Sequence, residues 1–120
     1  THLTDTGRKP SYYDAIITGD LGHVGKDILI ELAQTKGYNI KSNYNDCGVL
    51  IFDKETQDTH SGGSGCACCG TVFSGYLFNM LQTKKYKKIL LIATGALMNA
   101  TSSQQGESIP GIAHAISIEV

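Results

Sequence analysis

The chain has 120 residues, of which 41% are apolar, with 10 Lys and Arg against 11 Asp and Glu and a formal net charge of -1. This composition predicts one compact globular domain and excludes a disordered or collagen-like chain. A net charge so close to zero gives no field that would hold a polyanion, and the lysines between positions 84 and 88 form only one local cluster. Nucleic acid is therefore not an expected partner.

The sequence shows no membrane-spanning or targeting segment. No apolar run approaches the roughly 18 to 20 residues that a spanning helix needs, and the first residues lack the basic and apolar regions of a signal peptide. We therefore expect a soluble chain. It has no initiating Met and ends on the strand-like run 116–120, which indicates a piece of a longer protein.

The first third of the chain predicts a strand followed by a helix. Tyr12–Thr18 is a short run rich in β-branched residues and is closed by the turn Gly19–Gly22. Apolar residues then recur at helical spacing, and Gly37 follows as a C-terminal stop. They are Val24, Ile28, Leu29, Leu32 and Ala33. We expect this amphipathic helix to cover a sheet.

A second strand is expected after the turn cluster Asn43–Gly48, in the apolar run Val49–Phe52. Asp53–Ser61 is polar and reads as a loop. The order strand, helix, strand is typical of a parallel α/β unit.

Glycines at 62, 63 and 65 then precede a second helix. Its broad apolar face consists of Cys69, Val72, Phe73, Tyr76, Leu77, Met80 and Leu81. The other side carries the small residues Gly70, Ser74 and Gly75 instead of charges, so the helix is expected to be packed on more than one side.

The last third predicts two strands. Ile89–Ala93 is uniformly apolar, as in a strand covered on both faces, and Thr94–Ala96 should end it. After a polar connection at 99–107, Ile112–Val120 alternates like a strand near a sheet edge, antiparallel to its predecessor. The predicted fold class is α/β, with a mixed, mostly parallel sheet, helices on both faces and an antiparallel last strand.

The loop Gly62–Cys66 is the most informative local feature. Its backbone N–H groups and the start of the next helix could hold a carboxylate or phosphate. It is not a P-loop, because no Lys-Ser or Lys-Thr pair follows. The alternative is that the glycines only allow a tight entry into a closely packed helix.

Three of the four cysteines lie in Cys66–Cys69, and only Cys47 lies elsewhere. Such neighbours are too close to pair with each other, so a reducing compartment is expected. The thiols could share a soft metal ion, or one could be activated by the helix N-terminus. The simpler interpretation is that these small residues pack inside the first turn of the helix.

Asp20 and His23 follow the first strand, at the sheet edge where α/β proteins keep their sites. They could contact a ligand, or Asp20 could cap the next helix. His114 is expected to be a core histidine on the last strand, and His60 a solvated residue of the polar loop.

Several blocks in this order resemble the C-terminal half of thiolase-like proteins, and within them the stage V sporulation protein AD family. The resemblance covers essentially the whole chain. The blocks are Tyr13–Leu21, Asn45–Gly48, Ser61-Gly-Gly-Ser-Gly-Cys-Ala-Cys68, Ala93–Leu97 and Glu107–His114. The resemblance implies a duplicated fold in which long helices lie between two five-stranded mixed sheets. Residues 1–120 would form the second half, with an N-terminal thiolase-like half as partner, and homodimers paired through sheet edges are common among such proteins.

The resemblance also implies that the thiolase chemistry is missing. Active thiolases carry a catalytic His in a Gly-His-Pro stretch before the long helix and a Cys after the following strand. Here Gly63-Ser-Gly65 and Gly95 occupy these positions. A serine hydroxyl is no base near neutral pH and glycine has no side chain, so we expect no enzyme. The alternative is a divergent acyltransferase or condensing enzyme that uses the thiolate of Cys66 or Cys68.

The function implied by the resemblance is the binding of dipicolinic acid during its uptake into the developing bacterial spore, together with membrane proteins of the same operon. The protein would act in the sporulating cell or spore, peripheral to the inner spore membrane. The expected ligand-binding residues are Asp20, His23, Gly62, Gly63, Ser64, Cys66 and Gly95. No cofactor, catalytic residue or protein-bound metal is expected, although calcium could enter with the ligand and accept an oxygen of Asp20.

Overall fold

A four-stranded sheet forms the centre of the molecule. The computed structural model describes residues 1–63, 65–96 and 99–120. The strands lie in the order β2-β1-β3-β4. β1 pairs in parallel with β2 and with β3, whereas β4 is antiparallel to β3 and lies at the sheet edge. The strands are β1 (Ala15–Thr18), β2 (Tyr44–Asp46), β3 (Lys88–Ala96) and β4 (Gly111–Glu119). The predicted fold class is confirmed, including the antiparallel last strand.

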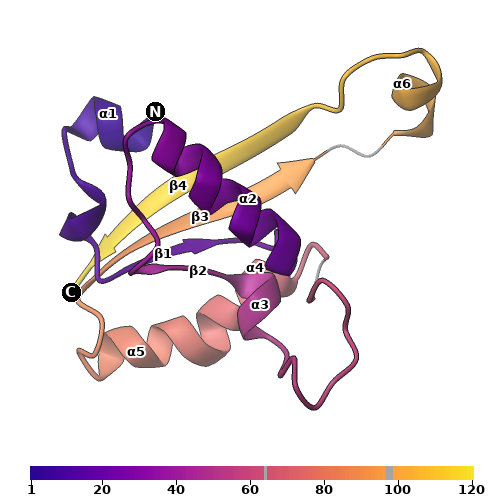
Figure 1. Ribbon diagram of the computed structural model, residues 1–120. Helices are drawn as coiled ribbons and strands as arrows, with labels where there is room; N and C mark the ends of the chain where they lie inside the picture. The colour runs from indigo at the N-terminus through magenta and orange to yellow at the C-terminus, as the bar shows by residue number, and fades with distance from the viewer. Residues whose placement is uncertain (64, 97–98) are drawn as a thin grey trace.

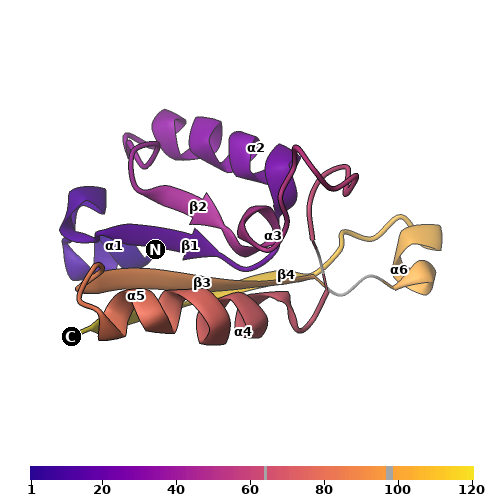
Figure 2. The same ribbon diagram turned by 90° about the horizontal axis from the view of Figure 1, so that it is seen from below.

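Helices cover both faces of this sheet (Figure 2). α2 (Gly22–Thr35) lies on one face. On the other face, α4 (Cys68–Val72), a π-helical turn at Phe73–Leu77 and α5 (Phe78–Gln82) form one continuous helix. The remaining short elements are α1 (His2–Thr6), a 3-10 turn (Pro10–Tyr12), α3 (Cys47–Leu50) and α6 (Ala100–Gln104). Within the described part of the chain, none of these helices has the length and apolar character to cross a bilayer.

Two hydrophobic cores form because side chains of each strand alternate between the faces. Ile17 and Leu91 point toward α4 and α5, where they pack with Leu77 and Leu81. Their strand neighbours Ile16 and Leu90 point toward α2 and pack with Tyr13, Ile40 and Tyr44. The expectation that the strand beginning at Ile89 is covered on both faces is thus confirmed for its buried residues 89–91.

The prediction for the second strand is wrong. Val49–Phe52 is not a strand: β2 lies earlier, within the segment expected to be a turn, and α3 follows it at Cys47–Leu50. The physical reason is Asp46, whose side chain accepts a hydrogen bond from the Gly48 N–H and so starts a helix before the apolar run. Pairing with β1 instead buries Tyr44 and Asp46.

Only part of the predicted apolar face of α2 covers the sheet. The expectation that this helix covers a sheet is confirmed, since Leu29, Ile30 and Ala33 pack on the core. Val24, Ile28 and Leu32, which belong to the same predicted apolar set, are exposed instead. The helix has two apolar stripes, and the sheet lies against one of them. Gly37 follows the helix with a positive φ of 81°, as predicted for its stop.

The β3–β4 ribbon runs past the end of the helical layer (Figures 1 and 2). β3 accordingly continues to Ala96, beyond its predicted end. The prediction of a core position for His114 is wrong, because this residue lies on the part of β4 that is exposed. The predicted polar connection contains α6, whose start is capped by the side chain of Asn99. The expectation that the long helix is packed on more than one side is not met within this chain, because its outer residues Gly70, Ser74 and Gly75 are exposed.

Candidate functional site

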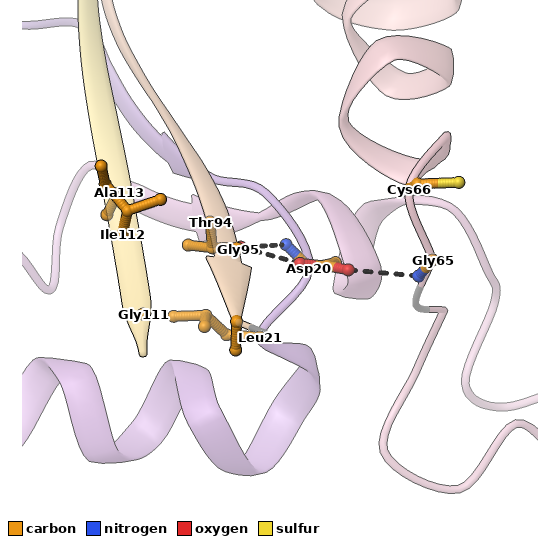
Figure 3. Close-up of a pocket in the computed structure, with 10 residues that line it drawn as sticks. Asp20, Leu21, Gly65, Cys66, Thr94, Gly95, Gly111, Ile112 and Ala113 are labelled. Carbon is orange, nitrogen blue, oxygen red and sulfur yellow. Dashed lines mark hydrogen bonds between the residues drawn. The ribbon is translucent and has the colours of Figure 1, made fainter. Parts of the chain in front are cut away.

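A hollow of about 850 Å³ opens where β1 and β3 end and β4 begins (Figure 3). The carboxyl ends of parallel strands meet at this edge, which is where α/β sheets place their ligand sites. The lining residues come from three places in the chain: the turn after β1, the glycine loop and the β3–β4 ribbon. They are Asp20, Leu21, Gly65, Cys66, Thr94, Gly95, Ala96, Gly111, Ile112 and Ala113.

Asp20, in the turn after β1, is hydrogen-bonded to the glycine loop and to β3, but not to β4. Its Oδ1 accepts a hydrogen bond from the Thr94 hydroxyl at 2.7 Å, and its Oδ2 accepts one from the Gly65 N–H at 3.1 Å. The Asp20 N–H in turn donates to Thr94 Oγ1 at 3.2 Å. The carboxylate is therefore held in place, as the dashed lines in Figure 3 show. Because the Gly65 N–H already donates to it, this amide is not available to a ligand.

The glycine loop is closely packed before it reaches the hollow. The Gly62 N–H donates to the Thr59 carbonyl at 2.9 Å and the Gly63 N–H donates to the Gly48 carbonyl at 2.8 Å. A Cβ on Gly62 would collide with the carbonyl oxygen of Gly48. The tight-entry interpretation of these glycines therefore has direct support. Within the described residues no acceptor is found for the N–H of Cys66, which lines the hollow, so this amide can donate to a ligand.

Asp46 holds the turn that carries Asp20 through hydrogen bonds to its backbone. It is not among the candidate residues predicted from the sequence. Its buried carboxylate accepts hydrogen bonds from the Thr18 hydroxyl at 2.6 Å and from the N–H groups of Leu21, Gly22 and Gly48, each at 2.9 Å. These bonds fix the turn that presents Asp20. The signal that could have identified it is an Asp directly before a segment able to form a helix, because Asp is a favoured N-cap residue.

Within the described residues, no group of three or more His, Cys, Asp or Glu side chains is arranged to hold a metal ion. All four thiols are free. Cys47 and Cys68 are buried in the core, and burial raises the pKa of both thiols and of Cys69. Cys66 is exposed, and its sulfur points away from the hollow in Figure 3.

The predicted site residues are only partly brought together. Asp20, Cys66 and Gly95 line the hollow. Gly63 lies instead on a second hollow of about 310 Å³ beside Ile51 and Phe52, and both hollows share Gly65 and Cys66. Gly62 packs on Gly48, and His23 lies in the first turn of α2, outside the lining residues.

Ser64 lies outside the described residues. Thr94, Gly111 and Ile112 line the hollow but were not candidates from the sequence. Their participation depends on how far β3 and β4 extend past the helices, which the apolar pattern of the strands does not reveal.

Comparison with known proteins supports a family assignment. The family model described as Stage V sporulation protein AD (SpoVAD) matches residues 1–119. Stage V sporulation protein AD of Bacillus subtilis (strain 168) is 40% identical to the chain over 118 residues, which is 98% of the chain and 35% of the relative. The chain thus spans about one third of the length of this relative. With the family model matching nearly the whole chain, the protein belongs to the stage V sporulation protein AD family.

Proposed function

We propose that the protein is a non-enzymatic binding protein for dipicolinic acid, free or as its calcium chelate, and serves its uptake into the developing spore. A role in sporulation follows from membership of the family. The choice of dipicolinic acid rests on the resemblance, and the chemistry of the hollow supports it.

The observation that carries the proposal is that the described lining of the hollow offers hydrogen-bonding groups without the thiol–histidine pair of a thiolase. Its polar groups are main-chain amides, the Thr94 hydroxyl and the Asp20 carboxylate. The thiol of Cys66 points away in Figure 3, and the described lining residues include no histidine. The one hydroxyl within hydrogen-bond reach of a base among the described lining residues is that of Thr94, which donates to Asp20 Oδ1 at 2.7 Å. This carboxylate also accepts from the Gly65 N–H, so the pair acts as a link between β3 and the glycine loop, and the thiol and imidazole of the thiolase reaction are not brought together by the described residues.

A planar dicarboxylate suits this arrangement because one of its carboxylates can accept a hydrogen bond from the Cys66 amide. Asp20 opposes a bare dianion, since it brings a negative charge to the same wall. A calcium ion bound to the ligand would convert this repulsion into attraction, because carboxylate oxygens are its preferred ligands. This is the reason to include the chelate in the proposal.

The exposed outer side of the long helix is consistent with a further layer of the same protein. Tyr76 and Phe78 are exposed on this helix, and Ile112 and Ile116 are exposed on β4. We propose that an N-terminal thiolase-like half covers this face and completes the hollow. Membrane proteins of the same operon and a location at the inner spore membrane are part of the same proposal, as is a homodimer.

The second candidate is a divergent thiolase-like acyltransferase or condensing enzyme that uses a cysteine thiolate. The observation that favours it is the exposed thiol of Cys66 beside the hollow. Against it, the thiols of Cys68 and Cys69 have raised pKa values because of burial, so they are protonated near neutral pH.

The test is calorimetric titration of dipicolinic acid, with and without calcium, into the full-length protein and into this chain. We expect saturable binding to the full-length protein, weakened at least tenfold by Gly95→Leu, because a side chain at this position projects from the wall of the hollow. Ala115→Leu is the matched control, since it adds the same side chain to the opposite face of the ribbon. Absence of heat in all forms, together with turnover of acyl thioesters, would favour the enzyme instead.

A further inference from the structure

The outer side of α2 carries an apolar stripe that nothing in the described chain covers. Val24, Ile28 and Leu32 follow each other at four-residue spacing and are 60%, 51% and 57% exposed. Side chains at this spacing form one ridge along a helix. The opposite stripe of α2 is the one that packs on the sheet. In Figure 2, α2 forms the outermost layer on its side of the molecule, so the ridge is open to a partner.

The ridge leads to the hollow. Leu21 continues it by three residues toward the N-terminus of the helix, and this residue also lines the hollow. A helix lying along the ridge would therefore end beside the mouth of the hollow. This position favours a functional contact over an incidental apolar patch.

The ridge has one acidic border. Asp27 directly precedes Ile28 and Glu31 directly precedes Leu32, so both carboxylates lie along the same side of the stripe. The two ion pairs found within residues 1–63, 65–96 and 99–120 involve other carboxylates, those of Glu119 and Asp58. Lys26, the nearest cation in the helix, donates instead to Asn45 Oδ1 at 2.9 Å. The charge of this border is therefore available to a partner.

We propose that this ridge is a docking surface for an amphipathic helix of a partner protein, whose own apolar ridge is bordered by Lys or Arg. Apolar ridges flanked by complementary charges are the usual basis of helix pairing, in which the charges choose the partner. Other occupants fit the charge less well. An anionic membrane surface would repel the acidic border, and an antiparallel second copy of α2 would place the acidic borders of both copies against each other.

The test uses the full-length protein and two synthetic amphipathic peptides with the same leucine ridge, one bordered by lysines and one by glutamates. We expect the lysine-bordered peptide to bind at least tenfold more tightly, as measured by fluorescence anisotropy. Ile28→Glu should abolish this binding while leaving the melting temperature unchanged, since the side chain is exposed. The double variant Asp27→Lys with Glu31→Lys should reverse the preference between the peptides.

The matched control is Glu55→Lys with Glu107→Lys, which makes the same change of charge at exposed positions outside α2. This control should keep the original preference. Equal binding of both peptides, or no reversal in the double variant, would overturn the proposal. So would protection of a Val24→Cys thiol from maleimide in the full-length monomer, because the protein would then cover its own ridge. A dimer that Ile28→Glu dissociates would also overturn it, in favour of a second copy. The same variants should bind dipicolinate like the parent protein, because their positions lie outside the lining of the hollow. Failure of the docking proposal and failure of the proposed ligand function can therefore be told apart.

Discussion

The Thr18 hydroxyl donates to Oδ2 of Asp46 across 2.6 Å, and this buried contact joins the end of β1 to the end of β2. Thr18 is also within hydrogen-bond distance of the Tyr44 hydroxyl, at 2.7 Å. Burial raises the pKa of Tyr44 to about 12, so the phenol keeps its proton at any physiological pH. The network makes Asp46 the acceptor on which the turn toward the hollow depends.

Removal of this acceptor should destabilise the fold. Asp46→Ala leaves the N–H groups of Leu21, Gly22 and Gly48 without their buried partner, and each unsatisfied donor costs about 1 to 3 kcal/mol. We expect a loss of at least about 3 kcal/mol in the free energy of unfolding, measured in urea. Asp53→Ala, at an exposed loop position, is the control and should cost much less. A loss below about 1 kcal/mol in Asp46→Ala would show that water replaces the carboxylate.

Two glycine substitutions should have opposite results although they make the same chemical change. A Cβ on Gly48 would collide with the Gly63 carbonyl oxygen, whereas a Cβ on Gly70 meets no atom within 4 Å. Gly48→Ala should therefore displace the glycine loop and lower the melting temperature. Gly70→Ala, in an exposed position of α4, should raise stability by about 0.5 to 1 kcal/mol. Equal melting temperatures in calorimetry would contradict the close packing of the loop.

The fold class was predictable because it depends on hydrophobic runs, which local sequence expresses directly. The run at 15–18, the helix before Gly37 and the alternation of the last strand each report burial on one or two faces. The second strand was not predictable in this way. β2 has three residues, and the structure buries its Tyr44 and Asp46 through hydrogen bonds that reach across to Thr18. Such long-range polar contacts leave no periodic pattern in the sequence.

The candidate site was predictable only where it follows from position in the chain. Asp20 was found because it follows a buried strand, and its contact with the hollow is where the sheet geometry would place it. Thr94 was missed because its role is to accept and donate hydrogen bonds with a residue 74 positions away. The exposed ridge of α2 was grouped together with the residues that cover the sheet, since spacing alone does not distinguish an apolar stripe that faces a sheet from one that faces a partner.

Acid should weaken the contact between Asp14, which directly precedes β1, and the backbone at the start of β3. Asp14 Oδ2 accepts hydrogen bonds from the N–H groups of Lys87 and Lys88, at 2.7 and 2.9 Å, and these bonds lower the pKa of Asp14 below its ordinary 3.8. A carboxyl whose pKa is lowered by folding stabilises the protein above its unfolded pKa, and this contribution is lost as the pH falls through the folded value. Asp14→Asn should therefore be less stable than the parent at pH 7, and the difference should shrink below pH 3.8. Urea unfolding at both pH values measures it, with Asp58→Asn in an exposed loop as the control. A difference that persists unchanged in acid would contradict the assignment.

The charge of Asp20 should control which form of the ligand binds. Asp20→Asn removes the negative charge from the wall of the hollow while it keeps a side chain able to bond Thr94. If dipicolinic acid binds here, the variant should bind the free dianion about tenfold more tightly, because a like charge near the surface is removed. Binding of the calcium chelate should weaken, since the ion loses a carboxylate oxygen. Titration with and without calcium measures both effects, and Glu55→Gln provides the control for net charge. Unchanged affinities for both forms would place the ligand elsewhere.

The thiols should react in two classes. Cys66 is exposed and should react with a disulfide reagent within seconds to minutes at neutral pH, whereas Cys47 and Cys68 should react only after unfolding, because burial limits access and raises their pKa values. The thiolate that the disulfide reagent releases, measured before and after denaturation of the protein, counts the thiols in each class. Cys66→Ser should remove the fast phase alone. Loss of the fast phase should leave dipicolinate affinity unchanged, because the sulfur points away from the hollow. A Cys66→Ser variant that loses both the fast phase and acyl-thioester turnover would instead support the enzymatic alternative, since a binding protein has no need of a reactive thiolate.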